Sequence, residues 1–344
     1  MTEGQDGPAG DEKPTPDPEP VADPSDAFQA LGNEIRTDIL STVLDASDRD
    51  TASLSFSTLF DASDVDTTAG FSYHLDELVG PYLEKDDSGY ALTYAGRKVA
   101  RAVEAGAYTD RVSGSSVPID DPCPFCAEPR LAATTSDNVV TIDCGDCDRS
   151  ILTLGFPPTG FTAHEDRLPE AFDRHHRHRL SLLSDGVCPE CSGRVDRDIT
   201  PITADGGEPI APAQSDESDA VPEPVQTTFV CRQCGYDLRC PVTLTVLEHP
   251  AVVSFYDDHD ESVRERPIWN VGREWRETPL SYDPIAVCVS VTLEEETLEC
   301  YVDETGSVVT TRRLDESSGD SESSRAGDDA TDVDAESAAK ADAA

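Results

Sequence analysis

Four Cys-x-x-Cys pairs constrain the fold of this 344-residue chain more than any other feature. Eight of its eleven cysteines form these pairs, which are Cys123/Cys126, Cys144/Cys147, Cys188/Cys191 and Cys231/Cys234. Such a turn brings two sulfur atoms onto one metal ion, and two turns complete the four thiolates of a structural zinc site. The pattern predicts two Zn²⁺ ions per chain.

The two predicted sites differ in the spacing between their pairs. Seventeen residues separate Cys126 from Cys144, which is typical of a zinc ribbon, and they predict a hairpin of residues 131–135 and 139–143. Thirty-nine residues separate Cys191 from Cys231, but residues 205–224 form an acidic, Pro-rich insert. Without this insert a ribbon remains, with strands at 195–202 and 225–230. Each doubling of loop length costs only about 0.6 kcal/mol, so the insert does not prevent a second site. The spacing leaves cross-pairing between the two units open.

Other uses of the cysteines fit the pattern less well. A reducing cytoplasm disfavours disulfides. Catalytic zinc requires an open coordination position, and a thioredoxin-like centre requires a single Cys-x-x-Cys at a strand–helix junction. Cys288 and Cys300 lie in alternating apolar strands and are predicted core residues, whereas Cys240 is either a core residue or a spare ligand.

The chain is strongly acidic, with 70 Asp and Glu against 26 Lys and Arg and a net charge of −44. The two ends and the insert hold less than half of this excess, so the rest of the chain is acidic too. Molar salt screens such self-repulsion because it shortens the Debye length to about 3 Å. We interpret the acidity as adaptation to a halophilic cytoplasm. Neither a membrane helix of roughly 18 apolar residues nor a secretory signal is apparent, so no membrane association is expected.

Helical periodicity dominates residues 25–106. The pattern predicts four helices, at residues 25–43, 56–60, 71–79 and 93–104. A hairpin is predicted at 82–93, around a Gly-containing turn. Three helices, a two-stranded ribbon and a further helix predict a winged helix-turn-helix, whose third helix enters the DNA major groove.

Three runs in this segment resemble haloarchaeal ArsR-like transcription regulators. Residues 70–79, GFSYHLDELV, and 90–96, YALTYAG, resemble the recognition helix and the wing, and residues 30–36, ALGNEIR, resemble the first helix. The resemblance covers about 80 residues. It implies binding to double-stranded DNA, with groove contacts from Thr67, Thr68, Ser72, Tyr73 and His74 and a wing contact from Lys85. ArsR metal sensors carry cysteines on the recognition helix, and residues 70–79 contain none.

The charge of this segment opposes DNA binding. Residues 26–106 contain 15 acidic and six basic residues, and the expected recognition helix carries Asp76 and Glu77 without a Lys or Arg. In molar salt, however, counterion release contributes little, and affinity depends more on base contacts and shape. The local basic cluster is either a phosphate contact or a solvated helix face, and it consists of Arg97, Lys98 and Arg101.

The most basic stretch of the chain, residues 174–179, lies on a predicted helix between the two cysteine units. A solvated helix face balanced by nearby acidic residues is the favoured interpretation. A phosphate-contacting linker and a histidine metal site are the alternatives. Toward the carboxyl end, the pattern predicts a helix at 244–256, an irregular segment containing both tryptophans, and strands at 287–293, 298–302 and 308–314.

Together these patterns predict an α+β protein with disordered acidic tails at 1–24 and 315–344. The predicted parts between them are a winged helix-turn-helix at 25–106, a zinc-ribbon-like unit at 121–160, a linker helix at 164–184, a second zinc-ribbon-like unit at 185–242 and a small α+β domain at 243–314. Because no motif of catalytic chemistry occurs, we expect no enzyme. The expected function is that of a homodimeric, zinc-containing DNA-binding transcription regulator. The alternative is a zinc-containing protein-interaction adaptor that does not bind nucleic acid.

Overall fold

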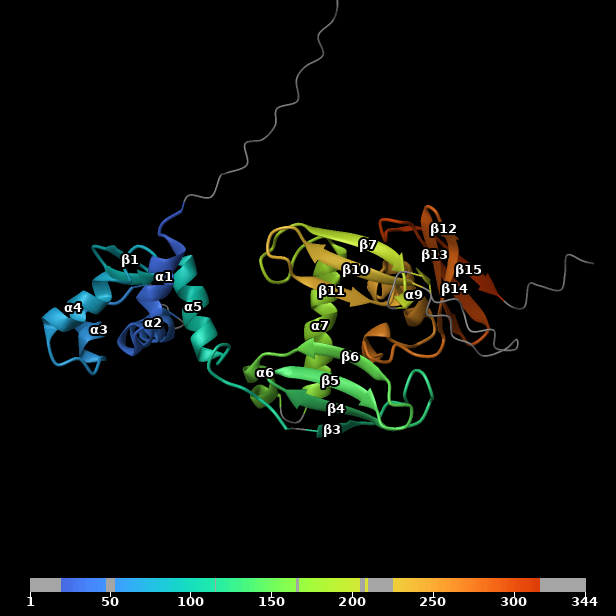
Figure 1. Cartoon of the computed structure of the whole chain (residues 1–344), viewed down its shortest axis with the longest axis horizontal. Helices are drawn as coiled ribbons and strands as arrows, with labels where there is room; N and C mark the ends of the chain where they lie inside the picture. The colour runs from blue at the N-terminus through green and yellow to red at the C-terminus, as the bar shows by residue number, and fades with distance from the viewer. Residues whose placement is uncertain are drawn as a thin grey trace, which may run out of the picture. The chain divides into compact units, whose positions relative to one another are not determined.

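The structure, a computed structural model, describes residues 20–47, 53–114, 116–164, 167–204, 208–209 and 225–315 (Figure 1). These residues form a mixed α+β structure with several antiparallel sheets. Of the two predicted acidic tails, the structure describes only residues 20–24 and 315. Of the predicted insert, it describes only residues 208–209. The chain divides into two compact units, one of which comprises Met1–Ser115, Thr135–Val140 and Gly155–Glu165. Among the described helices, none has the length and apolar character to cross a membrane.

The amino-terminal part consists of five helices and one hairpin. The helices are α1 (Pro24–Leu31), α2 (Glu34–Ser47), α3 (Phe56–Asp61), α4 (Thr68–Asp76) and α5 (Tyr94–Glu104). The hairpin pairs β1 (Leu83–Asp86) with β2 (Gly89–Leu92). The side chains of Asp23, Ser55, Thr67 and Thr93 each accept a backbone N–H and begin α1, α3, α4 and α5.

The prediction of one helix over 25–43 is wrong. The chain forms two helices, α1 and α2, because Gly32 and Asn33 interrupt the regular pattern between them. Phe28, which the sequence pattern placed on the apolar face, is 75% exposed. The hairpin and the helices α3, α4 and α5 lie close to their predicted positions.

The apolar side chains of α4 form the centre of this part. Phe71, Leu75 and Leu78 are fully buried among apolar residues of α2, α3 and the hairpin. An isolated bridge between Leu54 and Tyr90 extends the hairpin. Gly96 permits α5 to approach closely, because a Cβ atom there would lie 2.0 Å from the carbonyl oxygen of Tyr82.

Two antiparallel sheets follow. The first has the order β3 (Ser116–Ile119), β4 (Leu131–Ser136), β5 (Val139–Cys144) and β6 (Ser150–Gly155). Asp137 and Asn138 connect β4 to β5 with φ values of 51° and 62°, as a two-residue hairpin requires. The second has the order β11 (Asp237–Cys240), β10 (Val225–Cys231) and β7 (Val195–Pro201). The short strands β8 (Thr203–Ala204) and β9 (Glu208–Pro209) pair with each other.

Helix α7 (Leu168–Ser184) follows the short helix α6 (Pro158–Ala163); in its basic stretch Arg174 and His178 are exposed, as a solvated face requires, but His176 and Arg177 need a correction. Asp173, His176 and Arg177 are only 5–6% exposed. Arg177 forms an ion pair with Asp173, with 3.4 Å between Nε and Oδ2, and it also donates to the Arg266 carbonyl. One side of α7 is therefore buried core. Arg177 is neither on a solvated face nor available to a phosphate.

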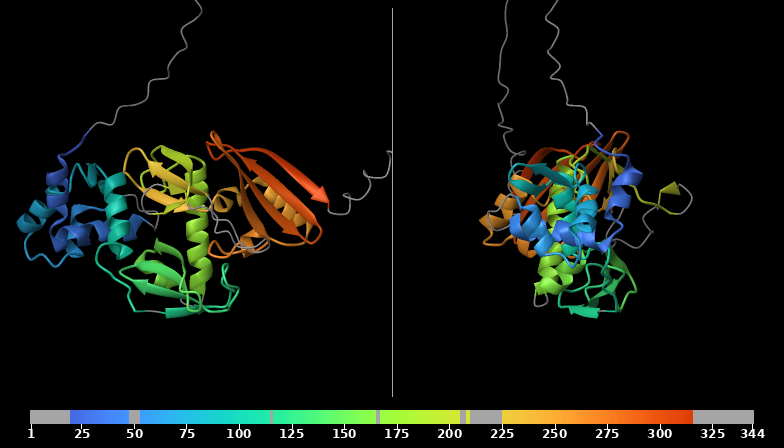
Figure 2. Two further views of the ribbon diagram at one scale, coloured as in Figure 1. Left: turned by 45° about the vertical axis from the view of Figure 1, so that its right-hand side comes forward. Right: turned by 90° about the vertical axis from the view of Figure 1, so that its left-hand side faces the viewer.

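The carboxyl-terminal part is a four-stranded antiparallel sheet with helices on one face. It contains α8 (Thr243–Val246), α9 (Pro250–Asp258), the 3₁₀ turn η2 (Val263–Glu265), β12 (Trp275–Tyr282), β13 (Ile285–Leu293), β14 (Glu296–Val302) and β15 (Val308–Asp315). The strands are ordered β12-β13-β14-β15, and α9 lies behind them in the left view of Figure 2. Ile199 of β7 and Val225 of β10 belong to the same core as this sheet.

Two predictions for this part are wrong. The helix predicted at 244–256 is broken into α8 and α9, because Pro250 has no N–H to continue a helix but suits a first turn. The segment predicted as irregular contains an additional strand, β12. Cys288 and Cys300, predicted as core residues, are 8% and 1% exposed.

Candidate metal centres and candidate nucleic-acid interface

The eight paired cysteines assemble into two groups of four. Within each group the sulfur atoms all lie within 4.8 Å of one another, so each group could hold a metal ion. The first centre consists of Cys123, Cys126, Cys144 and Cys147, and the second of Cys188, Cys191, Cys231 and Cys234. The structure therefore pairs the knuckles within each predicted unit rather than between the units.

The distances between sulfur atoms match a tetrahedral thiolate site. In the first centre they are 3.8 Å for Cys123–Cys147 and 3.6 Å for Cys126–Cys144. In the second they are 3.7 Å for Cys188–Cys234 and 3.5 Å for Cys191–Cys231. A tetrahedron with metal–sulfur bonds of about 2.3 Å has edges of about 3.8 Å. The residues thus fit a four-coordinate thiolate-bound metal.

All four Cys-x-x-Cys turns share one backbone geometry, shown most simply by the fourth. The N–H of Cys231 donates to the Tyr236 carbonyl, and the N–H of Gly235 donates back to the Cys231 carbonyl. In the other three turns the first cysteine likewise donates its N–H to the carbonyl five residues later. In the turns that begin at Cys123 and Cys188, the residue after the second cysteine also donates to the carbonyl of the first cysteine. In every turn the residue after the second cysteine has a left-handed φ, and these residues are Ala127, Asp148, Ser192 and Gly235.

Backbone N–H groups lower the pKa of one thiol in each centre, Cys144 in the first and Cys231 in the second. Hydrogen bonds from the N–H groups of Cys147 and Asp146 lower the pKa of Cys144 to about 7. Those of Cys234 and Gln233 lower the pKa of Cys231 to about 6. Because a thiolate is the form that ligates metals, the lowered pKa of Cys144 and Cys231 favours binding of a metal cation.

Cys240 is not part of either centre. It lies on β11, is 8% exposed, and burial raises the pKa of its thiol to about 12. Because Cys240 is buried and its sulfur belongs to neither group of four, the structure does not support a role as a spare ligand, and Cys240 packs as a core residue.

The two centres differ in exposure. The first cysteine of every turn is buried, with 0–2% exposed for Cys123, Cys144, Cys188 and Cys231. The second cysteines of the first centre, Cys126 and Cys147, are half-buried, whereas those of the second centre, Cys191 and Cys234, are exposed.

Helix α7 contacts the second centre directly. Arg179 forms an ion pair with Glu190, which lies between Cys188 and Cys191. Its guanidinium carbon also lies 5.3 Å from the centre of the Tyr236 ring, two residues after Cys234. Both turns of the second centre are therefore tied to the carboxyl-terminal half of α7.

A short segment, residues 266–270, connects α7 to the first centre. Asp173 of α7 accepts the Ile268 N–H at 2.7 Å. The next two side chains reach the residues just before Cys123: Trp269 Nε1 donates to Asp121 Oδ2 at 3.1 Å, and Asn270 Nδ2 donates to the Pro122 carbonyl at 2.9 Å. The same helix thus supports both centres.

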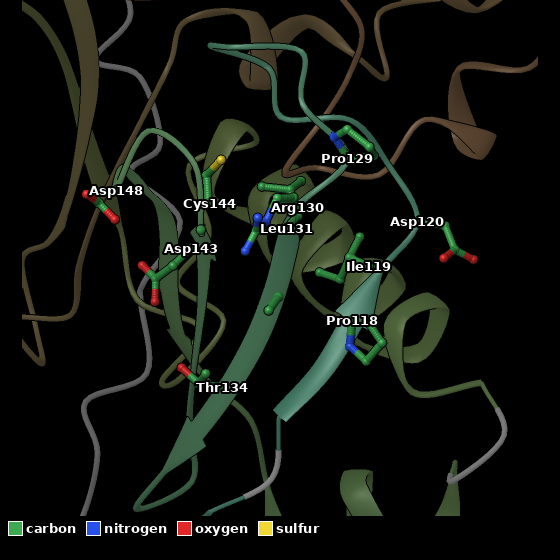
Figure 3. Close-up of a pocket in the computed structure, with 12 residues that line it drawn as sticks. Pro118, Ile119, Asp120, Pro129, Arg130, Leu131, Thr134, Asp143, Cys144 and Asp148 are labelled. Atoms are coloured by element: carbon green, nitrogen blue, oxygen red, sulfur yellow. The ribbon is translucent and has the colours of Figure 1, made fainter.

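An open groove of about 700 Å³ lies beside the first centre (Figure 3). Its lining combines the apolar residues Pro118, Ile119 and Leu131 with one cation, Arg130, and the carboxylates Asp120, Asp143 and Asp148. Arg130 is also 3.6 Å from Asp146. Because the carboxylates outnumber the cation, this groove offers no positive surface to a phosphate backbone.

The predicted DNA-contacting residues lie mainly on the surface of α4, the wing and α5. Thr67, Thr68 and Tyr73 are exposed, and Ser72 is half-buried. His74 is half-buried, and its Nδ1 is enclosed without a hydrogen-bond partner among the described residues.

On the wing and α5 the cations are accessible. Lys85 is exposed, with its Nζ 5.1 Å from the centre of the Tyr90 ring. Lys98 and Arg101 are exposed, and Arg97 is half-buried. Sequence reasoning did not anticipate Arg36, whose Nη1 lies 3.4 Å from Glu77 at the end of α4, and its position on the buried side of α2 gave no signal of this contact.

The fold and the two four-cysteine groups define a mixed α+β protein with two candidate metal centres. Residues 120–308, more than half of the chain, match the family described as Domain of unknown function (DUF7351), and the protein belongs to this family. Residues 24–103 match a second description, Domain of unknown function (DUF7347). No curated protein and no solved structure matches the chain.

Proposed function

We propose that this protein is a DNA-binding transcription regulator with two structural zinc ions. In this proposal α1–α5 and the β1–β2 hairpin form an ArsR-like winged helix-turn-helix. The order of elements supports it, because α3 and α4 precede a two-stranded wing and α5 closes the unit. The match of residues 24–103 to one family description agrees with an independent amino-terminal module.

The observation that carries the proposal is the two-sided character of α4. Phe71 and Leu75 fix one side of this helix in the core, with Leu78 just beyond its end. Away from the core the helix carries the exposed Thr68 and Tyr73, of which Tyr73 is 58% exposed, and the half-buried Ser72, whose hydroxyl lies 3.4 Å from Asp76 Oδ2. A rigid helix with hydroxyl groups and an aromatic ring on its free side suits hydrogen bonds and apolar contacts to base edges in a major groove.

The cations proposed for phosphate contacts lie outside α4, on the wing and on α5, and α5 packs mainly against α2. Lys85 extends from the wing, while Lys98 and Arg101 lie on α5. Because molar salt removes most of the benefit of counterion release, a few such contacts position the helix and base contacts supply most of the affinity.

For the metal centres, zinc is the proposed ion and its role is structural. Four cysteines complete a tetrahedron and leave no open position for a substrate or water. Metal analysis of the purified protein tests this. We expect two zinc ions per chain, and fewer than two would remove one or both centres from the proposal.

DNA binding is tested by selection from a pool of random duplexes in molar KCl, followed by fluorescence anisotropy with the enriched sequence. Tyr73→Ala removes a base contact and is expected to weaken binding about tenfold or more, since a good contact contributes about 1–3 kcal/mol. Tyr108→Ala is the control, because Tyr108 is 87% exposed and lies beyond α5. Failure to enrich any sequence, or equal effects of the two variants, would contradict the proposal.

One observation favours a second candidate, a protein-interaction adaptor. Helix α4 ends at the exposed Asp76, the next residue Glu77 is exposed and pairs with Arg36, and α4 contains no Lys or Arg. Such a helix suits a basic protein partner better than a phosphate backbone. Crosslinking to protein without crosslinking to DNA would favour this candidate.

We retain a homodimer as part of the proposal. Phe28 on α1 and Tyr94 on α5 are 75% and 79% exposed and offer apolar side chains to a second copy of the chain. Sedimentation of the intact protein tests this, and a monomer at micromolar concentration would remove the homodimer.

A further inference from the structure

The two metal centres have the same ligands and the same turn geometry but differ in solvent access. In the first centre two thiols are buried and two are half-buried. In the second centre Cys188 and Cys231 are buried, while Cys191 and Cys234 are exposed. Cys191 and Cys234 of the second centre are therefore more accessible residues than Cys126 and Cys147 at the equivalent positions of the first.

We propose that the second centre is an oxidation-sensitive site that releases its metal through a disulfide, while the first centre keeps its metal. This inference rests on metal occupancy of both centres, as proposed above. The oxidant is a hydroperoxide such as H₂O₂, and the reacting sulfur is that of Cys191 or Cys234.

The chemistry takes two steps, described here for Cys191. The Cys191 thiolate attacks one oxygen of H₂O₂, the O–O bond breaks, and Cys191 sulfenic acid and hydroxide form. The Cys231 thiolate, 3.5 Å away, then attacks the Cys191 sulfur and displaces a second hydroxide. In total two thiolates lose two electrons to one H₂O₂, which becomes two hydroxide ions.

Loss of two ligands leaves the second centre unable to hold a tetrahedral ion, and the metal leaves as a free cation. The new bond joins the two turns across the centre, because Cys191 and Cys231 come from different Cys-x-x-Cys turns. Glu190 lies in one of these turns and Tyr236 follows the other, and both contact Arg179 of α7. Oxidation therefore changes the support of the carboxyl-terminal half of α7, while the contacts of residues 266–270 near the first centre persist.

The experiment treats the full-length, metal-loaded protein with H₂O₂ in molar KCl and follows metal release with a chromophoric chelator. We expect one ion per chain to be released about tenfold or more faster than the other, because oxidation follows thiolate exposure. Peptide mapping after the fast phase is expected to find Cys191 joined to Cys231, or Cys234 joined to Cys188, with the four cysteines of the first centre reduced. Release of both ions at one rate, or earlier oxidation of Cys126 or Cys147, would overturn the inference.

A matched pair of variants locates the reactive centre. Cys191→Ser removes one attacking sulfur of the second centre, and Cys126→Ser changes the equivalent position of the first. We expect the fast phase to be reduced in Cys191→Ser and retained in Cys126→Ser. A fast phase that survives in Cys191→Ser and disappears in Cys126→Ser contradicts the assignment.

A second measurement uses only the unaltered protein. Brief labelling with N-ethylmaleimide is expected to modify Cys191 and Cys234 before Cys126 and Cys147, and the reverse order refutes the inference. Metal analysis before oxidation distinguishes failure of the proposed metal centres from failure of this inference. Fewer than two ions per chain before oxidation overturns the proposed metal centres. Two ions that are present and then released together overturn only the proposed difference between the centres.

Discussion

At the scale of single residues, the four Cys-x-x-Cys turns all require a left-handed backbone conformation at the residue after the second cysteine, and that residue differs in each turn. Ala127, Asp148, Ser192 and Gly235 occupy the same left-handed position with φ values of 65°, 54°, 59° and 73°. Only glycine adopts this conformation without a steric penalty from Cβ, which amounts to about 1–2 kcal/mol. Three of the turns therefore carry strain that the fourth avoids.

Relief of this strain is measurable. Ala127→Gly is expected to raise the free energy of unfolding by about 1 kcal/mol, and Gly235→Ala to lower it by a similar amount. A Cβ atom at Gly235 would meet no other atom within 4 Å, so the effect of that substitution reports the backbone alone. Urea unfolding of the metal-loaded protein measures both variants.

The control is Gly145→Ala, which lies within a turn but outside the left-handed region. Its added Cβ would be 3.7 Å from the nearest atoms, an ordinary contact, so a change below about 0.5 kcal/mol is expected. A loss in Gly145→Ala as large as that in Gly235→Ala would contradict the explanation by strain.

Asp173 gives a second expectation at this scale. Asp173→Ala leaves Arg177 as an uncompensated buried charge and removes the acceptor of the Ile268 N–H, with an expected cost of about 3–5 kcal/mol. Arg174→Ala, at the exposed neighbouring position, is expected to cost less than about 0.5 kcal/mol. Equal unfolding free energies for the two variants would show that the buried ion pair does not support α7.

At the scale of elements, local signals predicted much of the structure. The Gly-containing turn of the β1–β2 hairpin and the paired cysteines each act over a few residues, and the elements they predicted are present. The predictions that were wrong concern features that depend on contacts with distant parts of the chain. The charged run on α7 is partly buried because Asp173 and the carbonyl of Arg266 satisfy Arg177, and Arg266 is 89 residues away in sequence.

The missed strand and the broken helices have similar causes. Strand β12 alternates weakly and contains Pro279, yet pairing with β13 holds it in the sheet. Helices α1 and α2 are separated at Gly32 and Asn33. The apolar spacing of three and four residues continues across these two positions, so it did not indicate a break. For the metal centres, sequence spacing predicted the ligands but left the pairing between turns open, and the strand pairing of β7 with β10 decides it.

The insert provides an expectation at this scale. Strands β7 and β10 pair from Val195–Cys231 to Pro201–Val225, so the sheet register is complete without residues 205–224. Replacing these 20 residues by a short Gly-Ser loop is expected to change the free energy of unfolding by less than about 1 kcal/mol. The metal content is expected to stay the same, and loss of the second ion would show that the insert contributes to that centre.

At the scale of the whole molecule, residues 120–308 contain both candidate metal centres and the helix α7. Apolar residues of the second sheet and of the carboxyl-terminal sheet share a core, and α7 is linked to both centres. The amino-terminal part has its own core, formed from α1–α5 and the hairpin. The two parts therefore have different physical sources of stability.

Metal removal distinguishes these sources. Structural zinc contributes about 10–16 kcal/mol per site in small domains, so chelation under denaturant-free conditions is expected to expose residues 116–315 to protease. Residues 24–104 contain no cysteine and are expected to resist cleavage. Equal resistance of both parts after complete metal removal would contradict a structural role for the metal.

The proposal that α4 reads DNA is tested by genome-wide crosslinking of the tagged protein in the cells that produce it. A strain carrying Tyr73→Ala is compared with one carrying the surface control Tyr108→Ala. The account expects reproducible DNA sites for the unaltered protein and for Tyr108→Ala, and strongly reduced occupancy of the same sites for Tyr73→Ala. No reproducible sites for the unaltered protein, or undiminished occupancy in Tyr73→Ala, would contradict it.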